Sequence, residues 1–185
     1  MIQYKKTLFA FAIALFTAQS CQGQKTVINR EVETAGGKML LGTQSKDQLL
    51  KEPYSQWYNS EHDSYQLDQK TITDLKKEKL NAYNITLVLG TWCGDSHREV
   101  PRLMKILEAL NYPEAKLQMI AVNRKYEAPG GEESKYNIQR VPTIIVSRYG
   151  KEVGRIVEHP ATGYLERDLL DILKKDRSSL TDILK

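Results

Sequence analysis

Cys93 is the residue of this sequence whose setting most favours covalent chemistry. It follows a short apolar run at 85–89, which predicts a buried strand, and it precedes apolar residues with helical spacing at 100–110. A cysteine at such a strand-to-helix junction lies at the positive end of the helix dipole, beside unpaired backbone N–H groups. Both effects favour the thiolate, which is the nucleophilic form. The sequence therefore predicts a reactive thiol rather than an inert, buried one.

The residues that follow Cys93 are expected to tune this thiol. Ser96 lies in the same helical turn, so its hydroxyl is predicted to donate a hydrogen bond to the Cys93 sulfur. His97 adds a positive charge when it is protonated, whereas Asp95 places a negative charge nearby and opposes the thiolate. A Cys–His hydrolytic pair is disfavoured because the three histidines lack an obvious orienting partner.

Alternating strands and helices are predicted to hold this junction in place. Besides the strand and helix that flank Cys93, apolar runs predict strands at 117–122, 143–146 and 152–157, and helical spacing predicts a helix at 161–174. The order β-α-β, then a β-hairpin, then α predicts an α/β fold. It has a mixed central β-sheet, and we expect helices on both of its faces.

The motif around Cys93 resembles the active site of thioredoxins. Trp92-Cys93-Gly94-Asp95-Ser96 is similar to their Trp-Cys-Gly-Pro-Cys, with serine in place of the second cysteine. Pro101 stands where they have a proline that kinks the active-site helix. Val141-Pro142-Thr143 is similar to their Ile-Pro-Thr, whose proline is cis, and Gly150 stands where they have a hairpin glycine. The resemblance covers residues 66–175 and implies a thioredoxin fold.

The resemblance also implies roles for individual residues. Cys93 and Ser96 would be the catalytic pair, with Pro142 facing the cysteine. Backbone groups of Val141, Pro142 and Thr143 would hold an extended substrate peptide by strand-like hydrogen bonds. Four further residues are expected to shape the active site: Trp92, Gly94, Asp95 and His97.

Three departures from thioredoxins restrict the chemistry. With Ser96 in place of the second cysteine, the chain cannot form the intramolecular disulfide of a dithiol enzyme, so a mixed disulfide at Cys93 needs another thiol to resolve it. Leu87 stands where thioredoxins bury an aspartate, and Glu158 where they have a glycine lining the groove. We therefore expect monothiol thiol–disulfide exchange, of mixed-disulfide or isomerase type, with protein or small-molecule thiols and disulfides. The alternative is a non-catalytic peptide-binding module that has lost its second redox cysteine.

Composition excludes several other classes. Hydrophobic residues make up 41% of the 185 residues and charged residues 27%, the profile of a globular chain rather than of a disordered, collagen-like or multi-span membrane protein. The net charge of +4 includes no dense basic stripe, so nucleic acid is not an expected partner. Two cysteines at this spacing offer no zinc site, and we expect neither a metal nor a cofactor.

The N-terminus predicts export from the cytoplasm. Lys5 and Lys6 precede an apolar run at 8–18 that is too short to span a bilayer and is followed by small residues, so residues 1–20 are predicted to be a signal peptide. Cys21 follows Ala-Gln-Ser, which resembles the lipobox of bacterial lipoproteins but lacks its usual leucine. This sequence fits two outcomes: lipid attachment at Cys21, which would anchor the protein to a membrane, or cleavage by ordinary signal peptidase. Either outcome gives a periplasmic or secreted protein, which resembles the extracytoplasmic, TlpA-like branch of the superfamily.

The remaining segments are expected to support this domain. Residues 21–65 form an N-terminal extension that packs on the domain or tethers it, with a polar lead-in at 22–37 and a helix at 45–57 that Pro53 interrupts. Aromatic residues concentrated at 54–65 are expected to pack on the domain or to wall a substrate groove. A helix is predicted at 71–83, and residues 176–185 are expected to be a short tail.

Overall fold

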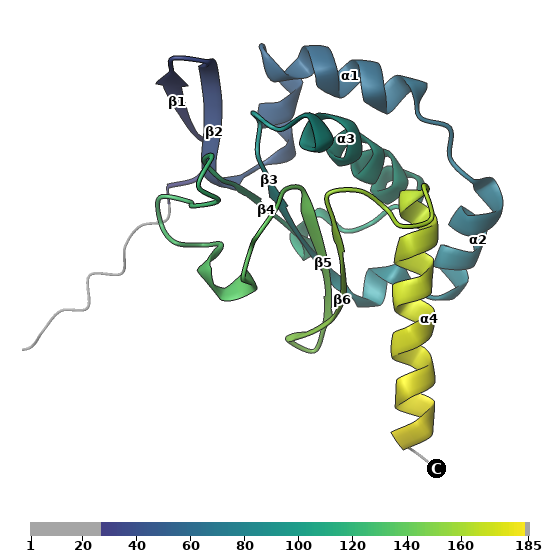
Figure 1. The fold of residues 1–185 in the computed structure, drawn as a ribbon. Helices are drawn as coiled ribbons and strands as arrows, with labels where there is room; N and C mark the ends of the chain where they lie inside the picture. The colour runs from purple at the N-terminus through teal and green to yellow at the C-terminus, as the bar shows by residue number, and fades with distance from the viewer. Residues whose placement is uncertain (1–26, 184–185) are drawn as a thin grey trace, which may run out of the picture.

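A six-stranded mixed sheet forms the centre of the fold, in the order β1-β2-β4-β3-β5-β6 (Figure 1). The structure is a computed structural model that describes residues 27–183, so the expected signal peptide and Cys21 lie outside the described residues. The strands are β1 (Arg30–Thr34), β2 (Gly37–Gln44), β3 (Asn84–Leu89), β4 (Leu117–Ala121), β5 (Thr143–Arg148) and β6 (Lys151–Val157). β3 and β4 are parallel and every other neighbouring pair is antiparallel. Strands β3 to β6 lie close to their predicted positions.

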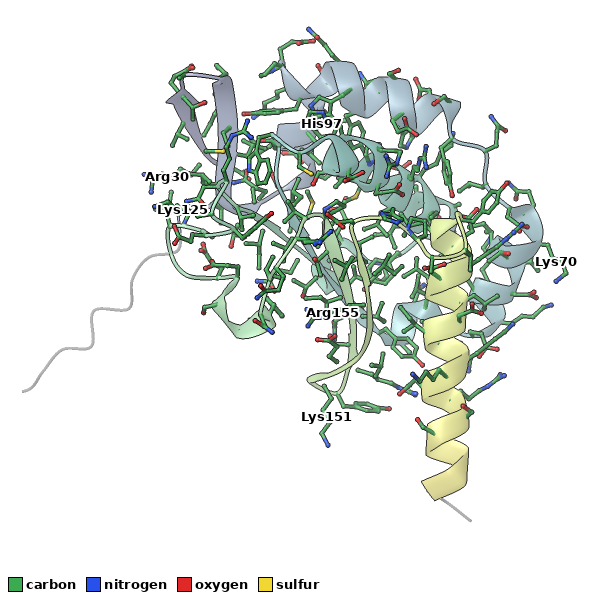
Figure 2. The ribbon with its side chains drawn as sticks, viewed as in Figure 1. Arg30, Lys70, His97, Lys125, Lys151 and Arg155 are labelled. Carbon is green, nitrogen blue, oxygen red and sulfur yellow. The ribbon has the colours of Figure 1, made fainter. Side chains whose placement is uncertain are left out.

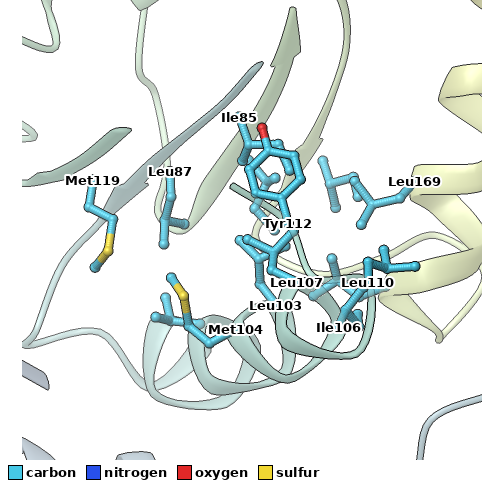
Figure 3. Packing of buried hydrophobic residues seen from close by; sticks show 14 of the residues in the cluster. Ile85, Leu87, Leu103, Met104, Ile106, Leu107, Leu110, Tyr112, Met119 and Leu169 are labelled. Carbon is cyan, nitrogen blue, oxygen red and sulfur yellow. The ribbon is translucent and has the colours of Figure 1, made fainter. Parts of the chain in front are cut away.

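Each of the α-helices in the described part of the chain contributes side chains to the core on one face of this sheet. They are α1 (Tyr54–Ser64), α2 (Gln69–Lys77), α3 (Gly94–Ala109) and α4 (Leu165–Ile183). Figure 3 shows Leu103 and Leu107 of α3 packed beneath Ile85 and Leu87 of β3, with Leu169 of α4 beside them. Leu87, which stands where thioredoxins bury an aspartate, is completely buried in this apolar core. Within residues 27–183, no helix has the length and apolar character needed to cross a membrane.

The opposite face of the sheet is covered by a long connection rather than by an α-helix. Val88 and Ile120 pack there against Val122, Ala128 and Val141, and the described part of the 122–142 segment has a single 3₁₀ turn, η4 (Ser134–Tyr136). We expected helices on both faces of the sheet, but in the structure an irregular segment covers this second face. The segment contains a Pro-Gly-Gly sequence and lacks a helical apolar period, which favours turns over a helix. The α/β thioredoxin fold with its mixed sheet is confirmed.

The N-terminal extension is part of the sheet and of the core. β2 pairs antiparallel with β4, and β1 pairs with β2 at the sheet edge. The polar lead-in at 22–37 thus contains β1 and the start of β2. Because β1 is an edge strand whose residues stay mostly exposed, it lacks the apolar alternation that reveals a half-buried strand. The extension then contributes buried Leu49 and Tyr58 to the same core as α3.

Two predicted helices are each divided into an α-helix and a 3₁₀ turn in the structure. The helix expected at 45–57 is split into a 3₁₀ turn, η1 (Lys46–Leu50), and α1, which begins directly after Pro53, a position where proline costs no helical hydrogen bond. The helix expected at 71–83 is α2 followed by a 3₁₀ turn, η2 (Leu80–Ala82), which begins after Lys79 at a positive φ of 56°.

The C-terminal tail expected at 176–185 is helical over most of its length, since α4 continues to Ile183. Asp176 explains part of this continuation. Its carboxylate accepts a hydrogen bond from the Tyr83 hydroxyl at 2.9 Å and pairs with Arg148 at 3.2 Å. This stretch of α4 is thereby attached to the ends of β3 and β5. These contacts join distant segments, so the local sequence at 176–185 could not predict them.

Asp68, which caps the N-terminus of α2, makes the stability of the fold sensitive to acid. Arg167 of α4 donates to its Oδ2 at 2.8 and 2.9 Å, and the Thr71 backbone N–H donates to its Oδ1 at 3.2 Å. These hydrogen bonds, chiefly those from Arg167, lower the pKa of Asp68 to about 2. The carboxyl of an unfolded chain titrates near about 3.9. The unfolded state therefore takes up the proton first, and the stabilisation is complete above about pH 4 and lost as the pH falls towards about 2.

We expect the urea midpoint of the natural protein to fall more steeply between pH 5 and pH 2 than that of Asp68→Asn, which cannot titrate at this position. Asp63→Asn is the matched control, because the Asp63 side chain is 82% exposed. This variant should show the same fall of the urea midpoint between pH 5 and pH 2 as the natural protein. Equal slopes for the natural protein and Asp68→Asn would contradict the assignment.

Candidate functional site

Cys93 is the N-cap residue of α3, at the junction where the sequence placed it. Its backbone N–H donates to Gly90 at 2.9 Å, and its carbonyl accepts from the His97 N–H at 3.0 Å, so the backbone on both sides is fixed. The half-buried thiol is free and donates a hydrogen bond to the Val141 carbonyl at 3.2 Å. Gly94, the next residue, is exposed, and a Cβ added there would meet no heavy atom within 4 Å.

The Val141-Pro142-Thr143 segment lies against this thiol. The Val141–Pro142 peptide bond is cis, and Val141 and Thr143 are both buried. Thr143 begins β5, and its hydroxyl donates to the Arg140 carbonyl at 2.7 Å. The Val141 carbonyl, one of the groups expected to bind a substrate peptide, accepts the Cys93 thiol instead in this structure.

Ser96 does not make the hydrogen bond expected of it. Its side chain is fully buried, and its hydroxyl oxygen accepts from the Gly90 N–H at 3.2 Å. No hydrogen bond joins Ser96 to Cys93 in the described part of the chain. The side chain points towards the loop that links β3 to α3, because that loop has a buried N–H that needs an acceptor. Ser96 therefore fixes the loop that carries Cys93.

Trp92 is held as part of the wall of the site. Its indole N–H donates to the Val122 carbonyl at 2.9 Å, and the Arg124 guanidinium lies over its ring, 5.1 Å from the centroid. Gly90 is required beneath the ring, since a Cβ there would lie 2.7 Å from the indole. Trp92, the residue before Cys93, is thus attached to the loop that follows β4.

His97 connects the site to the N-terminal extension. Its Nε2 lies 2.8 Å from the Thr91 carbonyl, which can only accept, so Nε2 carries a proton. The ring stacks on Trp57 of α1, with centroids 4.4 Å apart and an interplanar angle of 11°. Leu40 of β2 donates its N–H to the Thr91 hydroxyl at 3.2 Å. The extension therefore supports the segment before Cys93 from two sides.

The negative charge of Asp95 is balanced within α3. Arg98 donates to Asp95 at 2.8 Å and to Glu99 at 2.6 Å, and these carboxylates, Glu99 foremost, raise the pKa of Arg98 above its usual range. Asp95 is thus directed towards Arg98, which reduces its opposition to a thiolate at Cys93. Glu99 was not singled out from the sequence. It is almost fully buried, and its Oε2 has no hydrogen-bond partner among the described residues.

Glu158 flanks the cis-proline segment from the end of β6. It has a positive φ of 62°, a conformation that favours glycine, which is the residue thioredoxins have there. Its N–H donates to the Pro142 carbonyl at 2.7 Å. Its carboxylate pairs with Arg140 at 2.6 Å and holds the pKa of that guanidinium above its usual range. The pair adds charge beside the expected peptide groove.

Comparisons with known proteins show similarity in fold alone. No protein-family model matches the chain, and no curated protein matches it in sequence. A solved structure of a Pseudomonas aeruginosa protein of unknown function is 15% identical over 68% of this chain and 82% of its own, with a TM-score of 0.46. Mitochondrial thioredoxin 3 of Saccharomyces cerevisiae, in oxidized form, is 20% identical over 54% and 89%, with a TM-score of 0.36. The germline-specific thioredoxin Deadhead of Drosophila melanogaster is 13% identical over 56% and 88%, also with 0.36.

The site offers a nucleophile, Cys93, and a backbone acceptor, the Val141 carbonyl, and no side chain of the described residues accepts a hydrogen bond from the Cys93 thiol. Among the described residues, no group of three histidine, cysteine or carboxylate side chains is arranged to hold a metal ion. The structure brings together Cys93, Trp92 and the Val141-Pro142-Thr143 segment, which the sequence analysis had singled out. Sequence reasoning missed the stacking of Trp57 on His97, for which the only signal was the concentration of aromatic residues at 54–65.

Proposed function

We propose that this chain is an extracytoplasmic, TlpA-like protein of thioredoxin fold that performs monothiol thiol–disulfide exchange through Cys93. The observation that carries the proposal is the contact of a free thiol, at the N-terminus of α3, with the carbonyl that precedes the cis Val141–Pro142 bond. Export rests on the signal-like residues 1–20. Lipid attachment at Cys21 would anchor the mature chain to a membrane.

The exchange proceeds by two displacements. The Cys93 thiolate attacks one sulfur of a partner's disulfide, a bond forms between the two sulfurs, and the partner's other sulfur leaves with the electron pair and takes up a proton. A second thiol, from the same partner or from a small molecule, then attacks the mixed disulfide and releases Cys93 as thiolate. The chain itself is neither oxidised nor reduced overall, which suits an isomerase or a carrier of mixed disulfides.

Residues around Cys93 assist these steps in different ways. The N-terminus of α3 stabilises the thiolate through its dipole and its unpaired N–H groups. Loss of the thiol proton frees the Val141 carbonyl, which then accepts a hydrogen bond from an extended partner peptide. Ser96 contributes by holding the loop at Gly90 rather than by contacting the sulfur.

A second candidate function is peptide binding without catalysis. It is favoured by the position of the Ser96 hydroxyl, which is turned away from Cys93 and leaves the sulfur without a side-chain hydrogen-bond donor among the described residues. In that case the groove beside Pro142 binds a partner, and Cys93 has no need to be a reactive thiol.

The alkylation rate of Cys93 separates the two functions. The chain has two cysteines, so a Cys21→Ser background leaves Cys93 as the reacting thiol. We expect iodoacetamide at pH 6.5 to react severalfold faster with it than with an unstructured cysteine peptide, because the N-terminus of α3 and its free N–H groups stabilise the attacking sulfur. Trapping should also recover partners bound by disulfide to Cys93, and none from Cys93→Ser. A rate equal to that of the free peptide, with no disulfide-bound partners, would leave peptide binding as the function.

A further inference from the structure

A pocket of about 660 Å³ lies beside the segment that carries Cys93, and none of residues 141–143 lines it. Its walls are the turn between β1 and β2, the start of α3 with Thr91, Trp92 and His97, and the turn at 123–127. Its volume is in the range of ligand-binding pockets. Neither Cys93 nor Val141 lines it, so its occupant is bound beside the reacting sulfur rather than at it.

Positive charge dominates the lining of this pocket. Lys38, Arg124 and Lys125 line it together with one carboxylate, Glu127. Lys38 is already paired with Glu31 at 2.8 Å. By contrast, neither Arg124 nor Lys125 forms a salt bridge with any described residue. Figure 2 shows Lys125 on the side of the β1–β2 hairpin. Two cations that form no salt bridge with a described carboxylate thus line a pocket of ligand size, with Glu127 as the one acidic residue of its lining.

The turn that carries these two cations is ordered before any ligand binds. The side-chain oxygen of Asn123 accepts the backbone N–H groups of Lys125 at 2.8 Å and Glu127 at 3.1 Å. The Asn123 side-chain amide donates to the Glu127 carboxylate at 3.3 Å, which directs that charge towards the turn. Arg124 is supported by the ring of Trp92. The backbone of both cations and the side chain of Arg124 are thus held in place, so less freedom is lost when an anionic ligand binds.

The pocket is also coupled to Cys93 through Trp92. The indole of Trp92 bonds to Val122, directly before the cationic turn, while its backbone continues into Cys93. The cis-proline segment contacts the sulfur from Val141 and lies outside the pocket lining. A polypeptide that presents its disulfide to Cys93 can therefore lie along Val141 and reach across Trp92 into the pocket.

We propose that this pocket binds an acidic segment of the polypeptide that exchanges its disulfide with Cys93, with Arg124 and Lys125 receiving carboxylates. The inference rests on the proposed function and names its substrate class: proteins with acidic residues near the reacting cysteine. It makes the β1–β2 hairpin, supplied by the N-terminal extension, one wall of the substrate site.

Direct binding tests the pocket independently of the chemistry. A fluorescently labelled, blocked hexapeptide with two glutamates and no cysteine is titrated into the full chain carrying Cys93→Ser, beside its glutamine counterpart. We expect the acidic peptide to bind about fivefold more tightly in 20 mM salt, with the preference lost in 0.5 M salt by screening. It should also be lost in Arg124→Gln/Lys125→Gln and kept in Lys151→Gln, a matched change at the far β5–β6 turn (Figure 2). Equal binding of both peptides, or a preference that survives the double variant, would overturn the proposal.

The same two peptides, each extended by a cysteine in disulfide linkage to thionitrobenzoate, report exchange with natural Cys93. Faster release from the acidic peptide, dependent on Arg124 and Lys125, supports both proposals. Acidic preference in binding without release from either peptide contradicts the proposed exchange and leaves the pocket assignment standing. Release at equal rates, with equal binding, contradicts the pocket and leaves the exchange standing.

Discussion

Replacing Ser96 by cysteine is expected to give the protein a multi-turnover disulfide reductase activity that the natural chain lacks. In the natural chain, attack by Cys93 ends in a mixed disulfide, so about one equivalent of product thiol is released for each Cys93. A thiol at position 96 lies in the same turn of α3 as Cys93, and it has to turn from the Gly90 loop, which the Ser96 hydroxyl faces, towards the Cys93 sulfur. It can attack the mixed disulfide, release the second product thiol and leave an intramolecular disulfide for a reductase to reopen.

Insulin reduction, driven by thioredoxin reductase and NADPH without added small thiol, measures this gain. We expect at least on the order of ten turnovers from Ser96→Cys, and none beyond the first equivalent from the natural protein. Ser96→Ala is the control for loss of the hydroxyl, and Cys93→Ser/Ser96→Cys for attack by the new thiol alone. Sustained turnover by the natural protein would contradict the monothiol mechanism.

If Ser96→Cys fails to gain turnover, the groove residues become the explanation. Leu87 offers no proton acceptor beneath the site, and Glu158 adds an ion pair with Arg140 beside Pro142. Glu158→Gly in the Ser96→Cys background separates these two causes. It removes the charge and also suits the positive φ at this position, so a gain of turnover would assign the block to Glu158 rather than to Leu87.

The strands and the helix that position Cys93 could be predicted because the residues they bury form recognisable patterns within each segment. β3 and β5 are apolar over consecutive residues, as expected for strands covered on both faces, and α3 has its apolar residues at helical spacing. The location of Cys93 at the start of α3 followed from those two patterns. The thioredoxin-like motif then added the identity of the facing segment at Val141.

What the sequence did not predict depends on contacts between distant segments. Ser96 was placed in the correct helical turn, but the partner of its hydroxyl is set by the unpaired N–H of Gly90. Trp57 and His97 are 40 positions apart, and only the packing of α1 on α3 brings their rings together. β1 is an edge strand whose residues are mostly polar and exposed, so it could not be detected from hydrophobic periodicity.

Leu49→Ala is expected to destabilise the protein by about 2–5 kcal/mol, the usual range when a fully buried leucine is truncated. Leu49 lies in η1 of the N-terminal extension and has no exposed surface, in the same apolar core as α3. Leu50 is the matched control, since it is the next residue and is 49% exposed. Leu50→Ala should change the stability by only about 0.5 kcal/mol. Guanidinium unfolding of both variants, followed by tryptophan fluorescence, measures the difference.

The outcome decides whether the extension belongs to the cooperative folding unit that contains Cys93. If it does, Leu49→Ala lowers the denaturant midpoint of a single transition with an unchanged slope. Equal midpoints for the two variants would mean that the core can form without the extension. In the first case Trp57 is held on His97 for as long as the fold persists, and the segment before Cys93 keeps its support from α1 and β2. The extension is then a structural component of the thiol site as well as a wall of the acidic-peptide pocket.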